Sequence, residues 1–347
     1  MGFANVPNVS RKQISRAGDL LISDNYSQEE YDDALELVNQ WRACHAYPIN
    51  TFQSLLRKRI REGNYGGGPI VAQRLKRLPT IIDKLKRFSD MNLTTMQDIG
   101  GLRAILDSVD DVYRLRDEYI HGKFAHIRQR EDDYIAYPRS HDGYRSLHLT
   151  YKYKNYHNPS YDGLRVELQF RTKLQHLWAT AVETMDTFLG EKIKYRQGSR
   201  GWTDFFAATS SAFSFIENTA QVPRYNNLSC KETYDLVANI NKKIDAVQKM
   251  NGLSAAVSVL SETKGYVYHL ILLNSLENKV EIINFDRDSF EDAIRVYDQV
   301  EKGVLQGEKI EPVLVSAGKI DMVRKAYPNF FLDISDFLLR VREIIKE

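Results

Sequence analysis

The sequence has only two cysteines, no long apolar run and almost no net charge. Cys44 and Cys230 lie far apart in a chain of 347 residues, so they supply neither a disulfide framework nor a four-thiolate zinc site. No segment approaches the roughly 20 consecutive apolar residues that span a bilayer, and the first residues lack the apolar core of a signal peptide. We therefore expect a cytoplasmic protein with no membrane partner.

Charge is nearly balanced, with 48 basic and 46 acidic side chains. No global field therefore favours nucleic acid or membrane as a partner, and any cationic site must be local. The length and the 43% hydrophobic content favour two domains with packed cores. Because residues 191–200 form a basic segment without apolar periodicity, we predict domains of residues 1–195 and 196–347.

The apolar patterns predict an α+β fold, with a mixed β-sheet flanked by helices in the first domain and a smaller α+β second domain. In the first domain the predicted strands are 101–106, 124–128, 146–153 and 165–170. The predicted helices there include a basic helix at 70–88, interrupted near Pro79, and a helix at 174–188. In the second domain the predicted strands are 255–260, 266–273, 280–285 and 312–315, and the predicted helices include 203–219, 231–250 and 335–345.

Two carboxylates are candidates for a metal site. Residues 165–171 alternate between apolar and polar side chains, which places Glu167 on the polar face of a strand. Asp98 precedes a neighbouring strand, and magnesium in phosphoryl-transfer sites is held by one or two carboxylates. Asp98 and Glu167 could form that pair. The alternatives are a half-solvated sheet face for Glu167 and a turn residue for Asp98.

Basic residues are candidates for holding phosphate. On the predicted helix, Lys76 and Lys84 are a little over two turns apart and lie roughly on one side, so that with Arg74 they could bind a triphosphate. The alternative is a solvated helix face. Residues 133–148 add a loop with proline, glycine, aromatic and basic residues, which is either functional or a hairpin connection in which Tyr144 packs locally.

In this order, these segments resemble the synthetase domain of the RelA/SpoT alarmone family. The resemblance covers residues 70–172 and rests on four stretches: 74–84, 98–103, 133–148 and 167–172. It implies a nucleotidyltransferase-like fold and an ATP pyrophosphokinase, which transfers the β,γ-pyrophosphate of ATP to a 3′-hydroxyl and releases AMP. Positioning and charge neutralisation provide most of the catalysis in such transfers.

The resemblance also implies roles for individual residues. Four cations would bind the phosphates of ATP: Arg74, Lys76, Lys84 and Arg103. Three residues would form the catalytic centre: Asp98, Glu167 and His148. Of these, Asp98 would hold Mg2+, Glu167 would share it or deprotonate the attacking hydroxyl, and His148 would lie near the reacting phosphates. Three loop residues would bind the acceptor, with a base stacked on the tyrosine: Asp142, Tyr144 and Arg145.

One departure concerns the acceptor. The family usually has Asn before Gly-Tyr in the loop that recognises guanine, whereas this chain has His141-Asp142 and one extra residue. Residues 312–333 resemble the C-terminal domain of the CapRel type, a fused toxin and antitoxin within the toxic small synthetases. That resemblance implies a toxin acting on the 3′ end of tRNA, inhibited in cis until a phage protein binds. A chain ending near Arg200 is then expected to be more toxic than the full chain.

A second basic cluster could contact tRNA phosphates, or could be a solvated linker. It comprises Lys192, Lys194, Arg196 and Arg200. Three functions remain open from the sequence. They are a tRNA pyrophosphokinase, an alarmone synthetase that uses GTP or GDP, and a non-catalytic nucleotide sensor, which the presence of both Asp98 and Glu167 disfavours.

Overall fold

The computed structural model describes most of the chain, in two compact units. The described residues are 3–66, 68–76, 78–188, 200–260, 266, 268–274, 279–289, 292–293, 295–296, 299–300, 310–316 and 334–346. One unit comprises Met1–Tyr134 and Ser146–Lys173, and the other comprises Ile135–Arg145 and Leu174–Glu347. The predicted boundary between residues 195 and 196 lies outside the described residues, so it stays a prediction.

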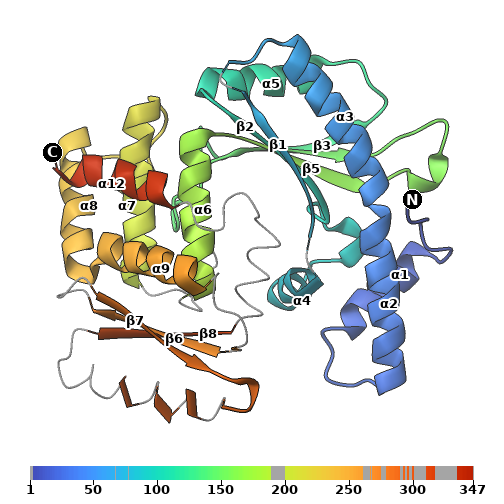
Figure 1. Ribbon diagram of the computed structural model, residues 1–347. Coiled ribbons are helices and arrows are strands. Elements are labelled where there is room, and N and C mark those ends of the chain that lie inside the picture. The colour runs from blue at the N-terminus through green and yellow to red at the C-terminus, as the bar shows by residue number, and fades with distance from the viewer. Residues whose placement is uncertain are drawn as a thin grey trace. The chain divides into compact units, whose positions relative to one another are not determined.

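The first unit is built on a five-stranded mixed sheet in the order β1-β2-β5-β4-β3. The strands are β1 (Ile70–Leu75), β2 (Gly100–Leu106), β3 (Ile127–Asp133), β4 (Leu147–Lys152) and β5 (Arg165–Thr172). Strands β2 and β5 are parallel, and the other neighbouring pairs are antiparallel. Figure 1 shows this sheet with α3 and α5 beside it. The predicted mixed sheet flanked by helices is confirmed.

The helices of the first unit are α1 (Arg11–Leu20), α2 (Gln28–Cys44), α3 (Ala46–Glu62), α4 (Leu78–Arg87) and α5 (Val109–His121). Of these, α3 and α5 pack against one face of that sheet. Phe52 of α3 lies 5.7 Å from Tyr151 of β4, ring centroid to ring centroid. Tyr119 of α5 lies 5.5 Å from Phe170 of β5. Because side chains alternate along a strand, the residues next to Tyr151 in β4 and next to Phe170 in β5 point to the opposite face of the sheet.

Two predicted elements of this unit are wrong. Residues 70–75 form strand β1 rather than the start of a helix, and only Leu78–Arg87 are helical. Six residues are too few for an apolar pattern to distinguish a strand from a helix. These residues form a strand because they pair with β2. The strand predicted at 124–128 is Ile127–Asp133, an edge strand whose first four side chains are all exposed, so it lacks the alternation that marks a strand.

The second unit combines helices with a three-stranded antiparallel sheet in the order β7-β6-β8. Its helices are α6 (Lys173–Phe188), α7 (Arg200–Glu217), α8 (Cys230–Ile244), α9 (Ala246–Leu260) and α12 (Ser335–Lys346), and its strands are β6 (Tyr268–Asn274), β7 (Lys279–Phe285) and β8 (Ile310–Ser316). One apolar core joins the five helices through buried residues such as Trp178, Phe206, Val237, Leu253 and Phe337. The C-terminal part thus combines helices and strands, as the predicted α+β class requires.

Two elements of the second unit were predicted wrongly. The helix predicted at 231–250 is two helices, with α8 ending at Ile244 and α9 beginning at Ala246. The strand expected at 255–260 is the end of helix α9, which continues to Leu260. Its run of small and branched residues is compatible with a strand or a helix, and it is helical because it continues the preceding turns of α9. Among the described residues, we find no helix with both the length and the apolar character needed to cross a membrane.

Candidate active site

A row of polar side chains crosses the open face of the first unit's sheet. Gln169 of β5 lies in register with Arg103 of β2 on one side and His148 of β4 on the other. Glu167, two residues earlier on β5, points to the same face and lies opposite Gly101. The polar face predicted from the alternation in residues 165–171 is therefore present, and it is shared by three adjacent strands.

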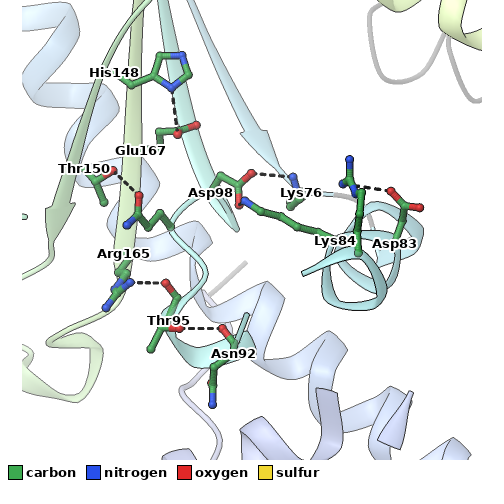
Figure 2. A network of polar contacts seen from close by, with 12 residues as sticks. Lys76, Asp83, Lys84, Asn92, Thr95, Asp98, His148, Thr150, Arg165 and Glu167 are labelled. Carbon is green, nitrogen blue, oxygen red and sulfur yellow. Dashed lines mark hydrogen bonds and ion pairs between the residues drawn. The ribbon is translucent and has the colours of Figure 1, made fainter. Parts of the chain in front are cut away.

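Asp98 lies at the edge of the sheet where β2 begins. Because β2 and β5 are parallel neighbours, the first residues of both strands lie at the same edge, which places Asp98 close to Glu167. The loop before Asp98 is anchored to the sheet. Thr150 of β4 donates a hydrogen bond to Gln97 at 3.4 Å, and Arg165 of β5 donates to the carbonyl of Thr95 (Figure 2).

Two lysines bind the carboxylate of Asp98. Lys76 Nζ lies 2.7 Å from Oδ2, and Lys84 Nζ lies 3.0 Å from Oδ1 (Figure 2). Lys76 follows β1, and its backbone N–H donates to the carbonyl of Ile99 at 2.8 Å, which extends the β1–β2 ladder to the residue beside Asp98. Lys84 comes from α4. The two lysines meet as predicted, but from a strand end and a helix rather than from one helix face.

The lysines set the ionisation of Asp98. Burial acts to raise its pKa, but the charges and hydrogen bonds of Lys76 and Lys84 outweigh burial and lower the pKa from 3.8 to about 2. Asp98 therefore stays ionised at any pH at which the protein works.

This shift predicts a pH-dependent stability difference. The lowered pKa stabilises the folded state by about 2 kcal/mol above pH 4, and this contribution is lost as the pH falls toward 2. Asp98→Asn should therefore lower the free energy of unfolding at pH 7, and the difference from wild type should shrink by pH 2.5. Urea unfolding of both proteins at the two pH values measures it. A difference that is the same at both would contradict the ion-pair explanation.

Glu167 is held between the two neighbouring polar side chains. His148 Nδ1 lies 3.2 Å from Oε1 (Figure 2), and Gln169 Nε2 donates to Oε2 at 2.7 Å. Burial acts to raise the pKa of Glu167, His148 lowers it, and the charge of Asp98 raises it, with a lowered pKa as the result. A carboxylate that is ionised, buried and bonded to a histidine can coordinate a cation or accept a proton.

Arg103 is the remaining predicted phosphate ligand whose side chain the structure describes. Its Nε is buried and has no hydrogen-bond partner in the described part of the chain. A phosphate oxygen could satisfy such a donor. Arg74 pairs with Gly101 through the β1–β2 ladder, and its side chain lies outside the described residues.

The carboxylates of Asp98 and Glu167 are suitable oxygen ligands for a magnesium ion. Mg2+ is typically bound through one or two carboxylates, with phosphate oxygens and water as the other ligands. Among the described residues, no cluster contains three or more His, Cys, Asp or Glu side chains that could hold a metal. Asp98 and Glu167 could therefore hold a metal together with substrate phosphates rather than in an all-protein cage.

The predicted acceptor residues belong to the second unit. Tyr144 is half-buried, with the Arg139 guanidinium 4.5 Å from its ring centroid and Trp178 at 6.3 Å, centroid to centroid. Asp142 is fully buried, lies 2.7 Å from Arg139 Nη2, and accepts a hydrogen bond from the backbone of Tyr144 at 3.0 Å. His141 Nε2 lies 3.4 Å from the same carboxylate.

Arg145, which was predicted to bind the acceptor, is buried and paired within the protein. Its side chain is 2% exposed and lies 2.5 Å from Glu217, the last residue of α7. The sequence offers no local sign of this partner, because 72 positions separate the two residues. Of the basic cluster, Arg200 is 95% exposed, and Lys192, Lys194 and Arg196 lie outside the described residues.

Comparison with known proteins finds a family match over part of this chain. Residues 73–188 match the family described as the region found in RelA / SpoT proteins, a range that contains every predicted catalytic and acceptor residue. The chain is 35% identical over 133 residues to the GTP pyrophosphokinase YjbM of Bacillus subtilis, a match that covers 36% of this chain and 62% of that protein. It is 24% identical over 177 residues to the GTP pyrophosphokinase of Haemophilus influenzae, covering 50% of this chain and 21% of that protein.

Among solved structures, the small alarmone synthetase 1 from Bacillus subtilis bound to its product pppGpp aligns with a TM-score of 0.43 and 24% identity. That alignment covers 50% of this chain and 89% of the other. The family match and the curated relatives confirm the predicted RelA/SpoT region, and they do not distinguish the CapRel type. The chain spans 62% and 21% of the length of the two curated relatives named above.

Proposed function

We propose that this protein is an ATP pyrophosphokinase, which moves the β,γ-pyrophosphate of ATP to a 3′-hydroxyl and releases AMP. One observation carries the proposal. Lys76 and Lys84 converge on Asp98 at the sheet edge that also holds Glu167, inside the segment that matches the RelA/SpoT region. Cations and carboxylates gathered at one place are what a phosphoryl-transfer site needs.

The proposed mechanism relies on positioning. Arg74, Lys76, Lys84 and Arg103 hold the triphosphate. Asp98 and Glu167 would hold magnesium, which would neutralise charge on the phosphate oxygens. The acceptor's 3′-oxygen bonds to the β-phosphorus, and the bond from that phosphorus to the α,β-bridging oxygen breaks, so that AMP leaves with the electron pair. The hydroxyl proton passes to Glu167 or to solvent. His148, 3.2 Å from Glu167, holds that carboxylate beside the reacting phosphates.

Two acceptors each have support. The 3′ end of tRNA is favoured by the departure at His141-Asp142. Asp142 stands where the family usually has Asn, and its carboxylate is buried and paired with Arg139. GTP or GDP is favoured by the names of the curated relatives, which are GTP pyrophosphokinases. Purified protein given labelled ATP with deacylated tRNA, GTP or GDP separates the two acceptors by which product carries the label.

With tRNA as acceptor, the protein would act as a toxin that blocks translation. We extend the proposal to inhibition in cis by the C-terminal part and release by a phage protein in antiviral defence. This extension is supported by the resemblance of residues 312–333 to the CapRel type. Residues 312–316 lie in β8, and residues 317–333 lie outside the described residues. Such a trigger acts only by binding the open state better than the closed one.

The acceptor role of Tyr144 is testable by substitution. Tyr144→Ala is expected to raise the KM for the acceptor about 10- to 100-fold, because base stacking on an aromatic contributes roughly 1–3 kcal/mol. The KM for ATP should change less than twofold. Tyr156→Ala is the matched control, since Tyr156 is 79% exposed and belongs to no proposed site. An equal rise in both KM values would remove Tyr144 from the acceptor site.

A further inference from the structure

The loop that carries Tyr144 is bound to helix α7 on both sides of that residue. On the C-terminal side, Arg145 makes hydrogen bonds to two side chains of α7 and to one that follows the helix. Nη1 lies 2.5 Å from Glu217 and 3.0 Å from Thr219, and Nε lies 3.1 Å from Ser210. Gln175 of α6 also donates to the Glu217 carboxylate, at 3.3 Å. The ion pair is therefore part of a network rather than an isolated contact.

On the N-terminal side, the backbone of Gly143 lies directly against α7. Ser210 Oγ donates to the carbonyl of Gly143 at 2.5 Å. A Cβ at this position would lie 2.9 Å from the Cα of Ala207 and 2.9 Å from the Cβ of Ser210. Gly143 also has φ +81°, a left-handed conformation that favours glycine. The approach of the loop to the helix therefore requires a glycine.

Because the ion pair between Arg145 and Glu217 is buried, losing one of its charges is costly. The side chains of Arg145 and Glu217 are 2% and 8% exposed, so removing either charge leaves the other in the interior without its partner, which is strongly unfavourable. A surface pair of the same kind would tolerate the loss. This cost is the physical reason that the loop stays on α7.

We propose that Glu217 is a positioning residue for the acceptor, which acts through Arg145 to fix the direction of the Tyr144 ring. Both neighbours of Tyr144 are held by α7, so the backbone from which the ring projects follows that helix. The proposal rests on the proposed function in one respect, the binding of the acceptor at Tyr144. It adds that α7, which lies outside the matched residues 73–188, is part of the acceptor site.

The first test separates the close approach from the backbone strain. Gly143→Ala adds a Cβ against α7, whereas Gly163→Ala, at φ +80°, adds one whose nearest neighbour is the end of the Arg11 side chain at 3.6 Å. Both variants carry the same strain, and only the first pushes the loop from the helix. We expect Gly143→Ala to raise the KM for the acceptor at least 10-fold and Gly163→Ala less than 2-fold. Equal effects would overturn the proposal.

The second test removes the charge. Glu217→Gln is compared with Glu343→Gln, which breaks an exposed pair with Arg340 on α12 of the same unit. Deacylated tRNA and GDP are both used as acceptors. We expect Glu217→Gln to raise the KM of the acceptor that the wild type uses at least 10-fold, with the KM for ATP changed less than 2-fold. Equal changes in both KM values, or no change in a folded variant, would overturn the proposal.

Hydrogen exchange provides a readout that does not depend on activity. In Glu217→Gln, the amides of residues 139–145 should exchange at least 10-fold faster, while those of β4 and β5 keep their wild-type rates. Faster exchange throughout the chain, or unchanged exchange in the loop, would show that the pair does not hold the loop specifically. If the wild type modifies neither acceptor while the loop responds as expected, the proposed function fails and the anchoring by Glu217 stands.

Discussion

Asp98→Asn or Glu167→Gln is expected to reduce pyrophosphate transfer by about 10³-fold or more, which is about 4 kcal/mol of transition-state stabilisation. Asp98 is the point where two lysines converge, and its loss would leave those cations without the carboxylate that orients them. Glu167 is the proposed acceptor of the hydroxyl proton and the partner of His148. A two-carboxylate metal site tolerates the loss of neither.

Asp162→Asn is the matched control for this prediction. Asp162 is also a carboxylate bound to a lysine, Lys154, in the same unit, but it has no part in the proposed site. Initial rates of label transfer from ATP are measured for each variant after circular dichroism has shown that it is folded. Near-normal rates in folded Asp98→Asn and Glu167→Gln proteins would contradict the assignment of both residues.

A chain that ends near Arg200 is expected to be inactive and poorly soluble. The sequence led to the opposite expectation, that this fragment would be a released toxin, and the structure changes it. The fragment lacks α7, so Arg145 would lose Glu217 and Ser210. The buried face of α6, including Trp178 and Met185, would be exposed to water, and each such side chain contributes roughly 2 kcal/mol when buried.

Expression of this fragment in a bacterial host tests the prediction. We expect unimpaired growth, with the fragment in the insoluble fraction, whereas the full chain is soluble. If the fragment is soluble and stops growth, and Glu167→Gln restores growth, then α7 is dispensable for activity and the released-toxin model is supported. Inhibition in cis is therefore better tested in chains that retain α7.

The polar face of the first unit's sheet was predictable because its information is local. Residues 165–171 alternate strictly, and the period of two fixes the face on which Glu167 lies. Asp98 is predictable as its neighbour because it precedes a strand. Lys76 and Lys84 were expected together for an incorrect reason. They meet because the β1–β2 ladder extends to Lys76 and because α4 brings Lys84 to the same carboxylate.

The anchoring of the acceptor loop was not predictable from the sequence. Arg145 lies beside Tyr144 in a loop rich in polar residues, which suggests contact with a ligand. Its burial follows from Glu217, whose approach depends on the packing of α7 against α6 through Trp178 and Phe206. A single sequence contains no signal for such a long-range pair. The segment 255–260 shows a simpler limit, since six small and branched residues suit a strand as well as the helix that they form.

The central claim is that the protein moves two phosphates of ATP as one group, and the fate of each phosphate tests it. Purified full-length protein is incubated with Mg2+, deacylated tRNA, GTP or GDP, and ATP labelled at either the γ- or the α-phosphate. We expect the γ-label on one acceptor and the α-label in AMP, in equal amounts, with both products lost in Glu167→Gln. Formation of ADP with a single phosphate on the acceptor would contradict it. If the protein binds ATP but transfers no label to any of the acceptors and releases no AMP, the result would instead support a nucleotide sensor.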